Sequence, residues 1–165
     1  MSKIIILRGN SASGKSTVAK ALQKRIGNGA FLISQDNVRK EMLCEKTGQH
    51  NQTVSLLENL VIYGHQNCEV SILDGMLSTG TYDDLFSLIE KTFNQQTLAY
   101  YFDIPFEETL RRHNQKPCTY EVEEIQLRKW WKEKDLLKNI NEKMICKDMN
   151  VDEIVELIYQ DLVSI

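Results

Sequence analysis

The sequence Gly9-Asn10-Ser11-Ala12-Ser13-Gly14-Lys15-Ser16 matches the pattern G-x-x-x-x-G-K-[ST] at every specified position. It lies between a predicted strand, residues 3–7, of which residues 4–7 are apolar, and a segment with helical periodicity, residues 15–26. A loop of this length can surround a phosphate with backbone N–H groups, and a helix that begins at its end adds a positive N-terminus. The pattern therefore predicts a buried strand, a phosphate-binding loop and a helix in succession.

The residues of this loop have separate predicted roles. Lys15 is expected to reach the β- and γ-phosphates of a nucleoside triphosphate such as ATP, and the Ser16 hydroxyl to ligate Mg²⁺. Gly9 and Gly14 allow backbone angles and a close approach that a Cβ would forbid. A Gly/Ser-rich turn without a ligand is the alternative interpretation. The predicted nucleotide-binding residues in this segment are Gly9, Asn10, Ser11, Ala12, Ser13, Gly14, Lys15, Ser16 and Thr17.

Apolar runs of strand length alternate with periodic segments of helix length along the rest of the chain. This alternation predicts an α/β fold, in which helices cover both faces of a parallel sheet. With no linker or internal repeat, residues 1–165 are expected to form a single domain. The predicted strands are 3–7, 30–33, 70–73, 97–102 and 144–146. The predicted helices are 15–26, 37–44, 52–66, 82–93, 107–113, most of 121–134, and 151–163.

The composition excludes several classes of protein. The chain has 165 residues, of which 42% are hydrophobic, and a net charge of −3, which argues against a dedicated duplex-binding protein. The longest apolar run, residues 98–102, is far shorter than the about 20 residues of a membrane span. The apolar run at the N-terminus is also shorter than the apolar core of a signal peptide. A cytoplasmic protein without a membrane partner is therefore expected. The cysteines and histidines show no metal-binding spacing, and nothing predicts an oligomeric state.

In a doubly wound sheet, ligands bind beyond the carboxyl ends of the strands, so the residues that follow each strand are candidates for function. Asp36 follows the second strand, where it could orient an acceptor hydroxyl and take its proton. Arg39, three residues later, could steady the acceptor or the moving phosphoryl group. The alternative is that Asp36 caps a helix and Arg39 is a solvated surface charge.

Asp74 follows the apolar strand 70–73. An acid in this position typically holds Mg²⁺ directly or through water, so Ser16 and Asp74 are the predicted metal ligands. The alternative is a turn aspartate before Gly75. For Asp103, which ends the fourth strand, a turn or cap role is favoured.

The segment 111–134 gathers positive charge in a chain that is otherwise acidic, because its seven Lys and Arg outnumber its four Glu by three. It is expected to form a small helical lid that closes over the triphosphate. Arg112 could there stabilise charge on the transferring group, although an ordinary solvated face is the alternative. Trp130 and Trp131 are expected to pack this lid on the core or, less simply, to stack on a base.

Together these residues predict an ATP- and Mg²⁺-dependent phosphotransferase whose acceptor is a hydroxyl of a nucleoside or another small molecule. The absence of N-K-x-D and D-x-x-G disfavours a GTPase switch, and the chain is short for a mechanical ATPase. Two alternatives remain: a 5′-hydroxyl polynucleotide kinase, for which a local basic groove would suffice, and a non-catalytic ATP-binding regulatory module.

The motifs resemble the small P-loop kinases related to the 5′-hydroxyl kinase domain of polynucleotide kinase, a group that includes zeta-toxin and chloramphenicol phosphotransferase relatives. Besides the phosphate loop, the resemblance is carried by Ser34-Gln35-Asp36-Asn37-Val38-Arg39 and by Phe102-Asp103-Ile104-Pro105 with Arg111-Arg112. The stretch Ile72-Leu73-Asp74-Gly75-Met76 also resembles bacterial proteins often labelled uridine kinase.

The resemblance implies a P-loop NTPase three-layer sandwich with five parallel strands in the order 2-3-1-4-5. It implies that Asp36 is the general base, that Arg39 lies on the acceptor side, and that Arg112 is a lid arginine that faces the triphosphate. Polynucleotide kinases have a further lid arginine, and Lys116 stands at that place here. A lysine offers a point charge instead of a bidentate fork.

Overall fold

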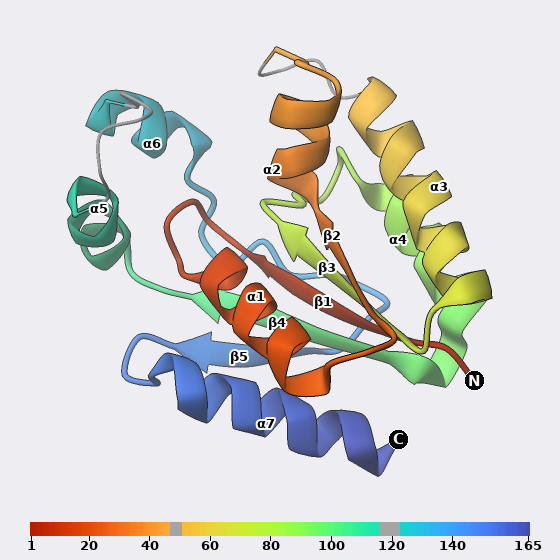
Figure 1. Cartoon of the computed structure of the whole chain (residues 1–165). Helices are drawn as coiled ribbons and strands as arrows, with labels where there is room; N and C mark the ends of the chain where they lie inside the picture. The colour runs from red at the N-terminus through yellow and green to blue at the C-terminus, as the bar shows by residue number, and fades with distance from the viewer. Residues whose placement is uncertain (47–50, 116–122) are drawn as a thin grey trace.

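The structure has a five-stranded parallel sheet at its centre (Figure 1). It is a computed structural model and describes residues 1–46, 51–115 and 123–165. The order of strands across the sheet is β2-β3-β1-β4-β5, and every neighbouring pair is parallel. This confirms the predicted parallel sheet and the strand order that the resemblance implies. The strands are β1 (Lys3–Gly9), β2 (Ala30–Ser34), β3 (Val70–Gly75), β4 (Thr97–Asp103) and β5 (Glu142–Cys146).

Helices cover both faces of the sheet, which confirms the three-layer sandwich. Helices α1 and α7 pack on one face, and α3 and α4 pack on the other (Figure 1). No helix within the described ranges has the length and apolar character needed to cross a bilayer. The helices are α1 (Lys15–Ile26), α2 (Gln35–Asn37), η1 (Val38–Met42), α3 (Asn51–Asn67), α4 (Asp83–Phe93), η2 (Asn94–Gln96), α5 (Phe106–Asn114), α6 (Glu124–Trp130) and α7 (Val151–Ser164).

Strand β1 is buried on both faces, which explains its continuous apolar sequence. The side chains of Ile4, Ile5, Ile6 and Leu7 are fully buried. Because successive side chains of a strand point to opposite faces, Ile5 and Leu7 join the apolar cluster with α1 and α7. Ile4 and Ile6 join the cluster with α3 and α4. The central strand therefore holds the phosphate loop, which follows it, on a rigid base.

The helix predicted over residues 37–44 differs in the structure. It begins as one short turn, α2, at Gln35 and continues as the wider turn η1, which ends at Met42. In η1 the N–H of Leu43 donates to the carbonyl of Val38, five residues earlier. A turn of this width shifts the side chains that follow it, and such turns are frequent at functional sites.

The helix predicted over most of 121–134 is described only as α6, and residues 116–122, with Lys116 among them, lie outside the described part of the chain. Helix α6 ends at Trp130 because the side chain of Asn10 forms hydrogen bonds with both the N–H and the carbonyl oxygen of Lys132. Trp130 and Trp131 are half-buried. The ring of Trp131 packs edge-on against Phe106 of α5, with centroids 5.2 Å apart.

Candidate active site

The phosphate loop joins the carboxyl end of β1 to the first turn of α1. Its two glycines have backbone angles that favour glycine: φ is 143° at Gly9 and 101° at Gly14. A Cβ at Gly9 would also lie 2.8 Å from the carbonyl oxygen of Phe102 on the neighbouring strand β4. The predicted need for glycine at both positions thus has a structural reason.

We expect the change Gly9→Ala to destabilise the fold by roughly 1–3 kcal/mol. Alanine would be strained at this positive φ, and its Cβ would clash with the backbone carbonyl oxygen of Phe102, which is fixed in strand β4. Gly27→Ala is the matched control: Gly27 also has a positive φ, but a Cβ there would meet nothing within 4 Å. Urea unfolding of both variants measures the difference. Equal losses of stability would show that the contact with Phe102 does not matter.

Lys15 places its ammonium group inside the loop. The side chain is buried, and its Nζ donates to the carbonyl oxygen of Asn10 at 2.7 Å and to Oγ of Ser13 at 3.1 Å. The loop backbone therefore holds the charge at the centre of the predicted phosphate site.

Ser16 and Asp74 meet at the carboxyl edge of the sheet. The Ser16 hydroxyl donates to Oδ2 of Asp74 at 2.6 Å, and Asp74 is only 2% exposed. Burial raises the pKa of Asp74 above its ordinary value, although the Ser16 hydrogen bond, the charge of Lys15 and the Ser34 hydroxyl act against it.

A buried carboxylate beside a hydroxyl is a donor set of hard oxygens, which fits Mg²⁺. Within the part of the chain that the structure describes, no group of three or more His, Cys, Asp or Glu could hold a metal ion. Magnesium in phosphoryl-transfer sites needs only one or two carboxylates besides the phosphates, so Ser16 and Asp74 remain suitable ligands.

Asp36 and Arg39 form a pair at the end of the neighbouring strand β2. Arg39 lies 3.5 Å from one carboxylate oxygen of Asp36, and Nζ of Lys40 lies 3.1 Å from the other. Asp36 is in the first turn of α2, whereas the N-cap is Ser34, so the capping interpretation of Asp36 is wrong. Its side chain is 58% exposed, which leaves the carboxylate accessible to a ligand.

The turn that carries Asp36 is held by Gln35, which sequence reasoning did not single out. Gln35 is buried, and its Nε2 donates to the hydroxyl of Tyr82 at 3.2 Å. It also lies against Gly75, where an added Cβ would be 2.6 Å from the Cβ of Gln35. No local pattern marks Gln35 or Tyr82, because their contact joins residues 47 positions apart.

Arg112 reaches the phosphate loop from α5. Its guanidinium donates to the carbonyl oxygen of Ser13 at 3.0 Å and to Glu108 at 2.7 Å. Arg111, which is exposed, also pairs with Glu108. Hydrogen bonds from Arg111 and then Arg112 lower the pKa of Glu108 to about 2. The structure thus brings four predicted residues together at the loop: Lys15, Ser16, Asp74 and Arg112. Asp36 and Arg39 lie after the carboxyl end of β2, the strand that pairs with β3.

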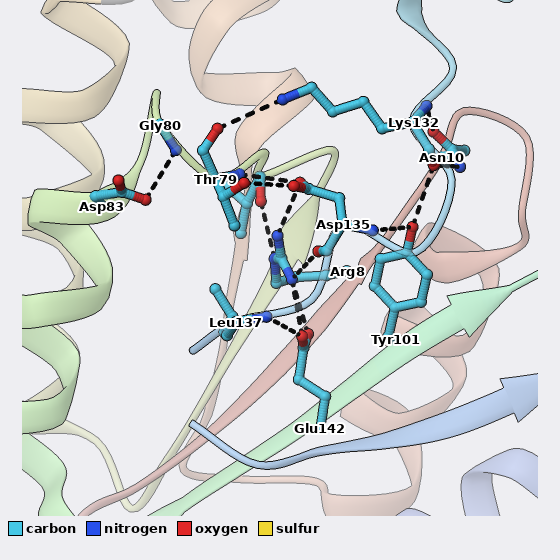
Figure 2. A network of polar contacts seen from close by, with 11 residues as sticks. Arg8, Asn10, Thr79, Gly80, Asp83, Tyr101, Lys132, Asp135, Leu137 and Glu142 are labelled. Atoms are coloured by element: carbon cyan, nitrogen blue, oxygen red, sulfur yellow. Dashed lines mark hydrogen bonds and ion pairs between the residues drawn. The ribbon is translucent and has the colours of Figure 1, made fainter. Parts of the chain in front are cut away.

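A buried ion network, which the sequence did not reveal, lies behind the loop (Figure 2). Arg8, the residue before Gly9, is 1% exposed. Its guanidinium donates to the carbonyl oxygen of Leu77 at 2.8 Å, to Asp135 and to the carboxylate of Glu142. The only sequence signal is a charged residue directly after the apolar residues 4–7.

The same network attaches the segment after α6 to the loop (Figure 2). Nδ2 of Asn10 donates to the carbonyl oxygen of Lys132 at 2.7 Å, and the N–H of Lys132 donates back to Asn10 at 3.0 Å. The side chain of Asn10 therefore binds the segment after α6, while its backbone forms part of the phosphate loop.

Comparison with known proteins places the chain in a family. Residues 4–137 match a family model, AAA_33, described as an AAA domain. A search of the curated proteins found no match.

Solved structures share the fold at low sequence identity. The chain is similar to the APS kinase of Mycobacterium tuberculosis in complex with AMPPNP and APS, at 18% identity and a TM-score of 0.68, over 99% of this chain and 98% of that one. It is also similar to shikimate kinase from Acinetobacter baumannii in complex with shikimate, at 16% identity and a TM-score of 0.63, over 99% and 94%. A chain of an RNA repair complex matches at 19% identity and a TM-score of 0.59, over 78% of this chain and 42% of its own length.

Proposed function

Since the chain belongs to this AAA domain family, we propose that it is an ATP- and Mg²⁺-dependent kinase that transfers the γ-phosphoryl group to a hydroxyl of a nucleoside or another small molecule. One observation carries the proposal. Strands β2, β3 and β1 are neighbours in the sheet, and their carboxyl ends supply Asp36, Asp74 and the Lys15 loop to one edge. A base, a metal ligand and a phosphate-binding lysine are the parts that phosphoryl transfer requires.

The proposed mechanism is mainly positioning and charge stabilisation. The backbone of the loop and Lys15 bind the β- and γ-phosphates, and Arg112 adds a second positive charge from α5. Ser16 and Asp74 would hold Mg²⁺, which neutralises charge on the phosphate oxygens when it is bound. Asp36 accepts the proton of the acceptor hydroxyl, while Arg39 orients the carboxylate or the acceptor.

Residues 1–165 would form one kinase domain in the cytoplasm, with 111–134 as its lid. Strand β5 and helix α7 follow the part matched by the family model, yet β5 pairs with β4 and α7 packs on α1. Both elements therefore belong to the same core as the phosphate loop.

A small-molecule acceptor is favoured over a polynucleotide. The similar kinases named above were solved with APS and with shikimate, both small molecules that carry hydroxyl groups. Asp83 and Asp84 are exposed where the loop after β3 enters α4, and they would repel a polyanion that approaches this side. Because the chain also matches a protein of an RNA repair complex, a 5′-hydroxyl polynucleotide kinase is the second candidate function.

A transfer screen with γ-labelled ATP tests the proposal. Nucleosides, amino sugars, antibiotics, hydroxy acids and short oligonucleotides are offered in turn, with Lys15→Ala as the inactive control. A labelled small molecule supports the proposal, whereas a labelled oligonucleotide whose binding weakens steeply with salt supports the second candidate. ATP binding without any labelled product would instead support a regulatory module.

We expect Asp74→Asn to raise the Mg²⁺ concentration needed for half-maximal transfer, by roughly 10–100-fold, because the amide is a weaker ligand than the carboxylate. Asp103→Asn is the matched control, since Asp103 also ends a strand but lies on β4. Titration of Mg²⁺ at saturating ATP measures both variants. An unchanged requirement in Asp74→Asn would remove Asp74 from the metal site.

A further inference from the structure

The loop between β3 and α4 is attached at one end to the buried network of Arg8 (Figure 2). Oδ2 of Asp135 accepts from the guanidinium of Arg8 at 3.2 Å and from the N–H of Thr79 at 2.9 Å. The hydroxyl of Thr79 donates to the other oxygen of the same carboxylate. Asp135 therefore joins Thr79 to the strand residue that directly precedes the phosphate loop.

The carboxylate of Asp135 suits this role because it stays charged. Burial tends to raise its pKa, but the two hydrogen bonds from Thr79 and the charges of Arg8 and Lys132 outweigh burial and lower the pKa below its ordinary value. Charge-assisted hydrogen bonds of this kind are stronger and shorter than neutral ones.

The other end of the same loop holds the turn that carries Asp36. Tyr82 is buried and accepts the hydrogen bond from Gln35, the residue next to Asp36. Only two residues separate Thr79 from Tyr82, and backbone hydrogen bonds from residues 81 and 82 to Ser78 close the turn between them. Thr79 and Tyr82 therefore lie in one short turn that backbone hydrogen bonds close.

We propose that Thr79 and Asp135 are positioning residues for Asp36: they fix the loop that holds Gln35, and so set the place of the Asp36 carboxylate relative to the phosphate loop. This inference rests on the proposed function, which gives Asp36 its role as base. Displacement of a reacting group by about 1 Å can cost roughly 100-fold in rate, so a contact outside the site can control the reaction.

The variant Thr79→Val tests the inference, because it removes the hydroxyl that donates to Asp135 and keeps the shape of the side chain. Thr81→Val is the matched control: it makes the same change in the same loop, at an exposed residue. Backbone hydrogen exchange, followed by mass spectrometry over residues 35–42, is expected to become faster in Thr79→Val and to stay unchanged in Thr81→Val. Thr79→Ser, which keeps the hydroxyl, is expected to restore the slow exchange.

The rate of transfer to an acceptor found in the screen gives the second readout. Thr79→Val is expected to lower kcat by roughly 10–100-fold with little change in KM for ATP. In an Asp36→Asn background the same change should have almost no further effect, because the group that it positions is already inactive.

Exchange over residues 35–42 that is equally slow in Thr79→Val and the wild type would overturn the inference, whether or not an acceptor is known. Independent, multiplying effects of Thr79→Val and Asp36→Asn on kcat would also overturn it. If Asp36→Asn alone left transfer unchanged, the assignment of the base would fall instead.

Discussion

Replacing Lys15 with alanine is expected to abolish phosphoryl transfer, with a loss of at least about 10²–10³-fold. The ammonium group of Lys15 lies inside the phosphate loop, held by Asn10 and Ser13. The side chain is buried, so its charge would act on bound phosphates with little screening by water. Binding of ATP should weaken as well, because the same charge acts on the bound triphosphate.

The loss must be separated from a loss of folding. Thermal unfolding of the Lys15→Ala protein should therefore be measured beside transfer from γ-labelled ATP. Lys20→Ala, on the exposed side of the same helix α1, serves as the matched control and is expected to keep full activity. A folded Lys15→Ala protein that transfers phosphate at the normal rate would contradict the assignment of the loop.

The change Asp36→Asn is expected to lower the transfer rate by roughly 10²–10⁴-fold and to leave ATP binding intact. Asparagine keeps the size of the side chain but cannot accept the proton of the acceptor hydroxyl. Within the described residues, the ion pairs of Asp36 are with Arg39 and Lys40, neither of which belongs to the phosphate loop. The effect should therefore appear in kcat, measured with an acceptor that the wild type phosphorylates.

The matched control for this variant is Asp84→Asn, an exposed aspartate in the first turn of α4, just as Asp36 is in the first turn of α2. Asp84→Asn should leave kcat unchanged. Equal, small effects of the two substitutions would mean that Asp36 is an ordinary surface carboxylate.

The central part of this architecture was predictable because its signals are local. The apolar run of β1 is continuous since both faces of the sheet are covered, and the glycine and lysine pattern of the loop follows from its backbone geometry. The loop pattern singles out Ser16, and the place after an apolar strand singles out Asp74. In the structure the Ser16 hydroxyl lies 2.6 Å from Oδ2 of Asp74. Adjacent parallel strands bring such residues to one edge.

The contacts that organise the rest were not predictable, since they join residues far apart in the chain. Arg8 looks like a charge at the end of a strand, yet its partners Asp135 and Glu142 are 127 and 134 positions away. The early end of α6 has the same cause, because it depends on the pairing of Asn10 with Lys132. Periodicity within a segment carries no information about either contact.

The dependence of Arg8 on Asp135 and Glu142 has a consequence for synthesis of the chain on the ribosome. Both carboxylates emerge long after the loop has been translated, and until then the guanidinium would be a costly charge in an apolar setting. The N-terminal part of the nascent chain, which contains Arg8 and the phosphate loop, therefore cannot complete its folding before these carboxylates are available. Acquisition of nucleotide binding should therefore not precede the exit of residue 142 from the ribosomal tunnel.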